Sequence, residues 1–246
     1  MLFIFQSIGK KHSLLLLSAT LILSGCGRWV NTSKYSFEDG IYYSKVFQDK
    51  KTKVYVDNEE DTLVIHPVKK HERRYVADTL ENKPILLPQN KSLSKIPSSS
   101  FRQNSFDIDF LTILVKVRPP GGNLPTQLNS NINGAAYAGY RADIYNISYK
   151  DTPLHFYNRK TNHFGFSLGG FFGIGATNIN PYNTNNQVND EYDGFIITKG
   201  VAGVLGLDNF NIGLVIGFDT LQGKDKNHWI YQQKPWIGIA LGLNLN

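Results

Sequence analysis

The segment HFGFSLGGFFGIGAT, residues 163–177, decides the expected fold class. Its even-numbered positions are mostly Phe, Leu and Ile, whereas its odd-numbered positions are small or polar apart from Phe171. Successive side chains of a β-strand point to opposite faces, so this alternation predicts a strand with one bulky apolar face and one small or polar face. The three-to-four-residue spacing of an amphipathic helix is absent from the segment.

The same period-two alternation recurs through the second half of the chain. In residues 131–145 the even-numbered positions are mostly apolar, and the odd-numbered positions include Asn131, Arg141 and Asp143. Sixteen of the 22 glycines lie between positions 134 and 242. We therefore expect strands at 106–118, 131–149, 163–177, 195–207, 211–221 and 236–246.

Strands of this composition suit a small membrane β-barrel better than a soluble sandwich. A sandwich turns charged side chains outward, but here the second face is mostly Gly, Ser and Asn. In a membrane barrel the bulky face contacts lipid, and a narrow interior requires small or polar residues. The predicted fold is all-β, a small antiparallel up-and-down membrane barrel of about eight strands. Either two amino-terminal strands join the six runs, or a partner closes an open sheet.

The connections between the runs alternate in length. Residues 178–193 and 222–235 are long polar connections, whereas Asp208 and Asn209 predict a tight turn. Outer-membrane barrels have long external loops and short periplasmic turns, so this alternation also favours a barrel. Aromatic residues near the run ends are expected to form an interfacial girdle. These residues are Tyr182, Tyr192, Trp229, Tyr231 and Trp236.

The first 25 residues have the features of a signal peptide. Lys10 and Lys11 precede the short apolar run LLLLSATLIL, residues 14–23. The following sequence, Leu-Ser-Gly-Cys at 23–26, resembles the lipobox of bacterial lipoproteins at every position. That resemblance implies cleavage before Cys26, the only cysteine of the chain, and its acylation with fatty acids such as palmitate. The alternative is an ordinary signal peptide followed by a coincidental cysteine. Two or more acyl chains give stable membrane attachment.

The alternating Gly-rich runs of residues 106–246 resemble bacterial outer-membrane β-barrel proteins, and together with the lipobox they are similar to proteins of the Bacteroidota. The resemblance implies an outer-membrane location, lipid contact through the acylated cysteine and the barrel surface, and membership of an outer-membrane protein complex. The terminal Asn246 departs from the aromatic residue that usually ends such barrels. Gly27 stands where an inner-membrane retention signal has Asp, and no acidic surface-export run follows, so we expect a periplasmic amino terminus.

The mature chain is expected to have three parts. A lipid-anchored β-rich segment occupies 26–80, a linker occupies 81–105, and the barrel-like domain occupies 106–246. The linker prediction rests on three prolines and a run of three serines, which cannot continue a helix or a central strand.

Composition excludes several classes of protein. A hydrophobic content of 41% is too high for a wholly disordered chain, and a single cysteine cannot form an intrachain disulfide. Without residues 1–25 the chain keeps 24 Lys and Arg against 20 Asp and Glu, a net charge of +4. This small excess forms no polybasic stripe, so nucleic acid is not an expected partner.

Residues with chemical potential are few. The five histidines of the mature chain form no His-x-x-x-His pair, and we expect neither a metal site nor a cofactor. The glycines of residues 169–175 lack the following helix and Lys of a phosphate-binding loop. His163 and Ser167 share a strand face but lie about 13 Å apart along it, too far for contact. We therefore expect no catalytic residues and no enzymatic activity.

Charged residues within the runs are expected to fill the barrel interior. Lys116, Arg118 and Lys199 lie in proposed strands, so they must face the interior or an interface. Asp219 is expected to meet Lys199 across a hairpin, which would satisfy both buried charges. The predicted interior polar network consists of Arg141, Asp143, Lys199 and Asp219. A transport or ligand-binding role for this network is an alternative.

Three functions are compatible with these features. The expected one is a non-enzymatic outer-membrane lipoprotein that acts as a structural or accessory subunit of the cell envelope. The second is a lipid-tethered periplasmic β-sandwich that acts as a binding module and whose apolar faces meet in a dry core. The third is a barrel enzyme, which requires His163 or His228 beside Ser and Asp in the folded chain.

Overall fold

The expected all-β class is confirmed in the part of the chain that the structure describes. The computed structural model describes residues 37–78, 83–91, 97–207 and 210–244. The predicted signal peptide, the lipobox-like sequence and Cys26 lie outside these ranges. Within them the chain forms thirteen β-strands and two 3₁₀ helices, η1 (Tyr182–Thr184) and η2 (Lys224–Asn227).

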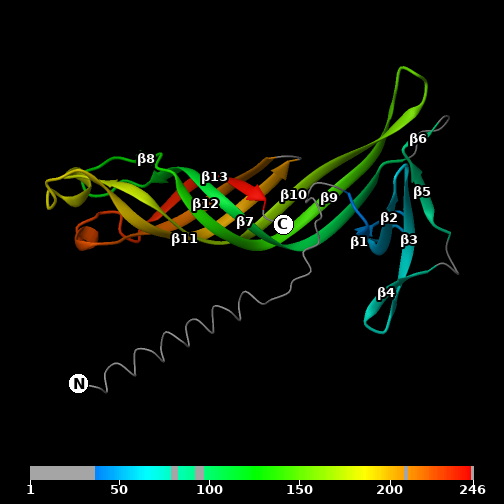
Figure 1. Ribbon diagram of the computed structural model, residues 1–246, viewed down its shortest axis with the longest axis horizontal. Helices are drawn as coiled ribbons and strands as arrows, with labels where there is room; N and C mark the ends of the chain where they lie inside the picture. Colours follow the sequence, from blue (N-terminus) through cyan, green and yellow to red (C-terminus); the bar gives the residue numbers. More distant parts are fainter. Residues whose placement is uncertain (1–36, 79–82, 92–96, 208–209, 245–246) are drawn as a thin grey trace, which may run out of the picture. The chain divides into compact units, whose positions relative to one another are not determined.

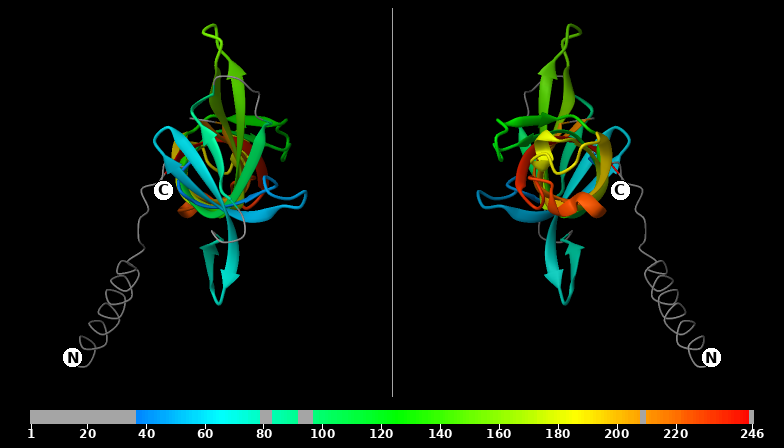
Figure 2. Two further views of the ribbon diagram at one scale, coloured as in Figure 1. Left: turned by 90° about the vertical axis from the view of Figure 1, so that its right-hand side faces the viewer. Right: turned by 90° about the vertical axis from the view of Figure 1, so that its left-hand side faces the viewer.

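Six long strands form a closed antiparallel ring, which Figure 2 shows in views along the ring axis. Each strand pairs with the next of the six in sequence, and the last pairs back with the first. This is the up-and-down, barrel-like arrangement that the alternation predicts. The six strands are β7 (Ser99–Arg118), β9 (Asn133–Asp151), β10 (Tyr157–Ile179), β11 (Tyr192–Leu207), β12 (Phe210–Leu221) and β13 (Pro235–Asn244).

The expected number of about eight strands is wrong for the described ring, which has six. β7 closes the seam alone, because residues 99–113 pair with β9 on one edge and residues 109–117 pair with β13 on the other. The six strands therefore close without the amino-terminal strands and without a partner. Strand number in a barrel is linked to tilt and stagger, and local composition specifies neither quantity.

The amino-terminal sheet, strands β1 to β6, is built on the projecting ends of β7, β9 and β10 (Figure 1). β1 (Gly40–Ser44) pairs with β7 and begins the order β1-β2-β3. β5 then pairs with β3, and β6 pairs with β10, so the small strands reach the ring strands on two sides. The other five strands are β2 (Thr52–Glu59), β3 (Thr62–His71), β4 (Arg74–Ala77), β5 (Ile85–Pro88) and β6 (Asn90–Lys91).

A conventional hydrophobic core joins the amino-terminal sheet to the ring strands. Phe37 lies 5.1 Å, between ring centroids, from both Phe101 of β7 and Tyr145 of β9. The Tyr42 hydroxyl donates a hydrogen bond to the Glu38 carbonyl oxygen at 2.8 Å, which satisfies that polar group inside the core. The buried members of this core are Phe37, Tyr42, Val54, Val56, Leu63, Ile65, Leu87, Phe101, Tyr145 and Ile147.

Much of the expected linker at 81–105 is regular structure in its described part. β5 and β6 lie within it, and residues 99–105 are the first third of β7. Residues 99–105 pair with β9 from Ser99 onward, so the long strand begins earlier than residue 106. Pro88 is the last residue of β5, at a position where a strand tolerates the missing N–H. The serine run resembled a linker because this end of β7 lacks the apolar outer face of the later part.

A β-bulge in β7 decides which side chains enter the ring. Ile239 of β13 pairs with Val115, but the next residue of β13, Ala240, pairs with Ile113, so Leu114 is the extra residue. From Asp107 to Ile113 the odd-numbered residues of β7 are buried, and after the bulge the even-numbered Lys116 and Arg118 are buried. The bulge therefore turns Lys116 and Arg118 into the interior.

Glycine permits the close strand approach that a six-stranded ring requires. A Cβ on Gly169 would collide with the Ala138 carbonyl oxygen and the Gly139 backbone of the neighbouring strand. A Cβ on Gly200 would collide with the Ile216 carbonyl oxygen and would lie 2.7 Å from the Gly217 Cα. Both collisions involve backbone atoms, so a side chain cannot be accommodated by rotation.

The end of the ring opposite the amino-terminal sheet is called the loop end here. β8 (Gln127–Asn129) pairs there with the last residues of β7, and the connections 180–191 and 222–234 carry η1 and η2. The Ile230 amide donates to the Asn183 carbonyl oxygen at 3.0 Å, which ties one connection to the other. The long connections predicted from the sequence therefore lie together at one end (Figure 1).

Candidate membrane-contacting surface and ring interior

All six ring strands carry exposed apolar side chains on their outer faces. Leu168 on β10 is 60% exposed and Leu214 on β12 is 62% exposed, values that are unusual for leucines in a soluble domain. Exposed apolar side chains therefore occur on every strand around the ring, unlike the singly scattered ones of an ordinary soluble surface. Further members are Phe106, Phe110, Tyr140, Phe166, Phe172, Ile174, Phe195, Val201, Ile216, Ile237 and Ile239.

The apolar outer surface ends where the strands approach the amino-terminal sheet. On β10 the exposed outer residues are apolar from Phe164 to Ile174, but Lys160 and Asn162 before them are polar. On β9 the outer residues after Ile144 are likewise polar, ending at Lys150. The apolar stretch of β10 is thus about as long as the 9–11 residues that a tilted strand needs to cross a bilayer.

The interior of the ring holds two charged layers separated by an apolar layer. The apolar layer consists of ten buried residues, among them Tyr137, Phe171 and Trp236. The ring centroids of Phe171 and Trp236 are 6.1 Å apart, so large side chains meet across the interior. Phe171 interrupts the small residues of its strand face because it helps to fill this layer. The remaining members are Leu111, Ile113, Ala135, Ala202, Val204, Val215 and Ala240.

The charged layer nearer the loop end joins β7 to β12 through the carboxylate of Asp219. Asp219 of β12, which is fully buried, accepts hydrogen bonds from Lys116 Nζ at 3.0 Å and from Arg118 Nη2 at 2.5 Å. Lys116 Nζ also lies 4.5 Å from the ring centroid of Trp236 on β13, a cation–π contact. Fully buried charges require an oppositely charged partner of this kind, because burial removes their hydration.

The charged layer nearer the amino-terminal sheet is centred on Asp143. Arg141 Nε donates to Asp143 Oδ1 at 2.8 Å, and His163 Nε2 lies 2.7 Å from the same oxygen. All three side chains are buried, and Asp107 and Asp109 on β7 add two buried carboxylates to this end of the interior. A Cβ on Gly165 would lie within 3 Å of Arg141 and Asp143 atoms, so that glycine provides the space for this network.

The structure places three of the four residues of the predicted interior network inside the ring. Arg141 and Asp143 contact each other, and Asp219 is buried with Lys116 and Arg118. The expected contact between Asp219 and Lys199 is wrong. Lys199 is exposed on the outer face of β11, where it pairs with Phe172 and Phe218, and its neighbour Thr198 is the buried residue opposite Asp219.

The expected aromatic girdle is also corrected for three of its five members. Trp229, Tyr231 and Trp236 are buried inside the ring or beneath the loops, whereas Tyr182 and Tyr192 are exposed. The Arg118 guanidinium carbon lies 4.9 Å from the Trp229 ring centroid and 5.4 Å from that of Tyr231. These aromatic rings therefore surround buried cations. Position near a strand end indicated an interface, but it did not reveal which face each ring occupies.

The geometry of an acyl-transfer enzyme is not assembled among the described residues. His163 does lie beside Asp143, but the Ser167 hydroxyl is 2.7 Å from the Tyr137 hydroxyl instead of meeting the histidine. Within the described ranges, no group of three or more His, Cys, Asp and Glu side chains is placed to hold a metal ion.

The sandwich alternative requires the bulky faces of the strands to pack against each other. In the described ring these faces are exposed, and the buried layer is formed by the opposite faces of the same strands. No helix within the described residues is long and apolar enough to cross a membrane. No protein-family model, curated protein or solved structure matches this chain.

Proposed function

We propose that this protein is an outer-membrane lipoprotein whose six-stranded ring lies in the lipid bilayer and fixes its amino-terminal sheet at the periplasmic surface. It acts as a structural or accessory subunit of the envelope and performs no chemistry of its own. The observation that carries the proposal is the inversion of the ring, with apolar side chains exposed outside and charged side chains buried inside.

The exposed leucines, isoleucines and phenylalanines of the outer face make a bilayer location energetically favourable. Burial of apolar surface contributes about 25 cal/mol per Å², so a large exposed apolar surface is unfavourable in water. Hydrocarbon removes this cost, and the pairing of β13 with β7 closes the described ring, so the first and last strands satisfy each other's backbone groups. Lys199 is compatible with this setting, because a lysine stem can follow the apolar surface while its ammonium reaches the interface.

The orientation follows from the two different ends of the ring. Outer-membrane barrels place long connections outside the cell and their amino termini in the periplasm. The loop end therefore faces the exterior, and the amino-terminal sheet faces the periplasm. Cys26 lies eleven residues before Phe37, and eleven fully extended residues span at most about 40 Å at 3.3–3.6 Å per residue. An acyl anchor in the periplasmic leaflet is within this reach.

The filled interior supports an anchoring role in preference to conduction. Phe171, Trp236 and the other residues of the apolar layer occupy the space that water would need, and a charged layer lies on each side. Large porin channels require many more strands than six. An accessory subunit of this kind would associate with other envelope proteins through its amino-terminal sheet.

The test is aqueous accessibility of cysteines placed in the full chain within native membranes. Cys26 is acylated in the proposed form and does not react. Leu168→Cys on the apolar surface should resist a charged maleimide until the protein is denatured, whereas Tyr182→Cys at the loop end should react at once. Both side chains are highly exposed in the structure. Equal reaction of the two cysteines in intact membranes would contradict a bilayer location for the ring.

The anchor is tested separately. Cys26→Ser should abolish incorporation of labelled palmitate, while the ring keeps the protein in the membrane fraction after a carbonate wash. Palmitate incorporation into the Cys26→Ser protein would contradict acylation at this residue. Release of the variant by carbonate would contradict membrane insertion of the ring.

A further inference from the structure

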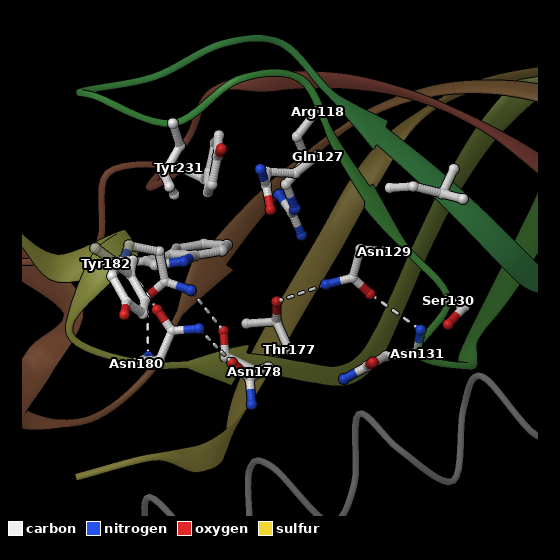
Figure 3. Close-up of a pocket in the computed structure, with 14 residues that line it drawn as sticks. Arg118, Gln127, Asn129, Ser130, Asn131, Thr177, Asn178, Asn180, Tyr182 and Tyr231 are labelled. Atoms are coloured by element: carbon white, nitrogen blue, oxygen red, sulfur yellow. Dashed lines mark hydrogen bonds between the residues drawn. The ribbon is translucent and has the colours of Figure 1, made fainter.

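A polar pocket lies at the loop end, next to the charged layer that contains Arg118. Its volume is about 300 Å³, at the lower end of the range of small-molecule sites. The end of β7, β8, the end of β10 and the two long connections all contribute to its wall. Figure 3 shows Arg118 and Gln127 side by side, pointing into the space bordered by Tyr231, Tyr182 and Thr177.

Three buried side chains of this wall carry polar atoms that have no hydrogen-bond partner among the residues that the structure describes. They are Arg118 through Nη1, Trp229 through Nε1 and Tyr231 through its hydroxyl. Each of these side chains is more than nine-tenths buried, so the missing bonds are costly unless something else accepts them. The guanidinium and the indole can only donate, and the phenol can also donate. The described residues therefore supply no acceptor oxygen to these three groups.

The positive charge beside the pocket also favours an anionic ligand. Lys116 and Arg118 share the single carboxylate of Asp219. The three side chains together therefore carry one excess positive charge. Arg118 uses Nη2 for that carboxylate, and its Nη1 has no hydrogen-bond partner among the described residues. A carboxylate or phosphate group in the pocket would balance the charge and accept from Nη1 at the same time.

The rest of the wall is rich in amides that are held in place. Asn129 Nδ2 donates to Thr177 Oγ1 at 3.2 Å, and the Asn131 amide donates to Asn129 Oδ1 at 2.9 Å. Asn180 and Asn183 bond to each other through backbone amides and side-chain oxygens at 3.0 and 3.1 Å. Tyr182 is 74% exposed and lines the pocket, so its ring offers an apolar face. Fixed amides and an aromatic face suit a polyhydroxylated ligand.

We propose that the pocket binds an anionic sugar, with the carboxylate or phosphate at Arg118 and Tyr231 and the hydroxyl groups at the amide wall. The inference concerns the loop end alone and holds whether or not the ring lies in a membrane. A uronic acid and a sugar phosphate share the required chemistry, so both are probes.

The experiment is calorimetric titration of the full chain in a zwitterionic detergent that has no sugar headgroup. The ligands are glucuronate, glucose 6-phosphate, glucose and inorganic phosphate. Three variants are compared with the unaltered protein. Arg118→Gln removes the excess charge and leaves Lys116 and Asp219 as a one-to-one pair. Tyr231→Phe removes only the unpartnered hydroxyl, and Tyr140→Phe on the exposed outer face is the matched control.

We expect at least one anionic sugar to bind, glucose to bind at least tenfold more weakly, and inorganic phosphate also to bind more weakly. Arg118→Gln should weaken binding tenfold or more, as expected for a lost charged hydrogen bond. Tyr231→Phe should weaken it severalfold without lowering the unfolding temperature, and Tyr140→Phe should leave it unchanged. The better of the two anionic sugars identifies the preferred anion.

Four results would overturn the proposal. One is no binding of either anionic sugar at millimolar concentration. Another is equal affinity for inorganic phosphate and the anionic sugars, which would show that the sugar is not recognised. Equal affinity for glucose and the anionic sugars would show that the anion is not recognised. The last is unchanged binding by Tyr231→Phe, which keeps the test decisive even if Arg118→Gln does not fold.

Discussion

Gly169 and Gly170 are adjacent residues of β10 that face opposite sides of the ring. Substitution of each one by alanine therefore compares a crowded interior position with an open outer position. Gly169→Ala places a methyl group against the backbone of β9, whereas Gly170→Ala places it 3.7 Å from the nearest backbone oxygen. We expect Gly169→Ala to lower stability by about 1–3 kcal/mol, the usual cost of overpacking. Gly170→Ala should be neutral or slightly stabilising. Thermal unfolding followed by gel mobility measures both, and equal effects would contradict the close approach of β9 and β10.

Asp219 carries the second prediction at the scale of single residues. Asp219→Asn leaves Lys116 and Arg118 buried without their carboxylate, so we expect a loss of about 3–5 kcal/mol of stability. Asp190→Asn, at an exposed position in the connection that carries η1, is the matched control and should have little effect. Denaturant unfolding in detergent measures the difference. Comparable stability of the two variants would show that the buried network does not hold the loop end together.

At the scale of the element, the bulge in β7 determines the charge of both ring faces. Deletion of Leu114 and Val115 together would put Lys116 directly after the inward-facing Ile113 and turn Lys116 and Arg118 onto the apolar outer surface. We expect the deletion to impair formation of the heat-modifiable folded form, because two basic residues would be added to the lipid-facing surface, each at a cost that rises toward about 2–4 kcal/mol at mid-bilayer. Leu114→Ala keeps the bulge and should fold. A deletion variant that folds as well as Leu114→Ala would contradict the assigned role of the bulge.

The amino-terminal sheet should be sensitive to alkaline pH through Tyr42. Burial raises the pKa of the Tyr42 phenol well above its ordinary value. Because the folded pKa is higher than the unfolded one, this tyrosine favours folding below pH 10 and opposes it increasingly as the pH rises above 10. Tyr42→Phe cannot ionise, so its stability should fall less between pH 10 and pH 12 than that of the unaltered protein. Parallel losses in denaturant unfolding at the two pH values would contradict the buried ionisation.

The elements predicted from sequence were those in which composition alternates strictly. The runs that became β9 to β13 were identified because each has a bulky face and a small face over ten or more residues. The beginning of β7 was missed because residues 99–105 lie outside the apolar surface and carry polar side chains on their exposed face. Alternation identifies a strand only where one of its faces is apolar.

At the scale of the whole molecule, the closure of the ring and the ion-pair partners inside it could not be predicted from local sequence patterns. The six-strand count follows from pairing both edges of β7, a long-range fact that no single run contains. Lys199 was assigned to the interior because a charge in an apolar strand was assumed to need a buried partner. Its place in the alternation, next to the buried Thr198, gives the correct outward face. The pocket was not found either, because its residues are brought together by loops distant in sequence.

The most direct test of the account uses nitroxide spin labels on the outer face of β10 in lipid vesicles. Labels at Phe166, Leu168 and Phe172 should be reached by dissolved oxygen but shielded from a water-soluble nickel chelate, since oxygen concentrates in hydrocarbon. A label at Tyr182 should be reached by the nickel chelate. Strong nickel accessibility at the three strand positions would place them in water, and low accessibility to both reagents would place them under protein. Either result would contradict a lipid-facing ring.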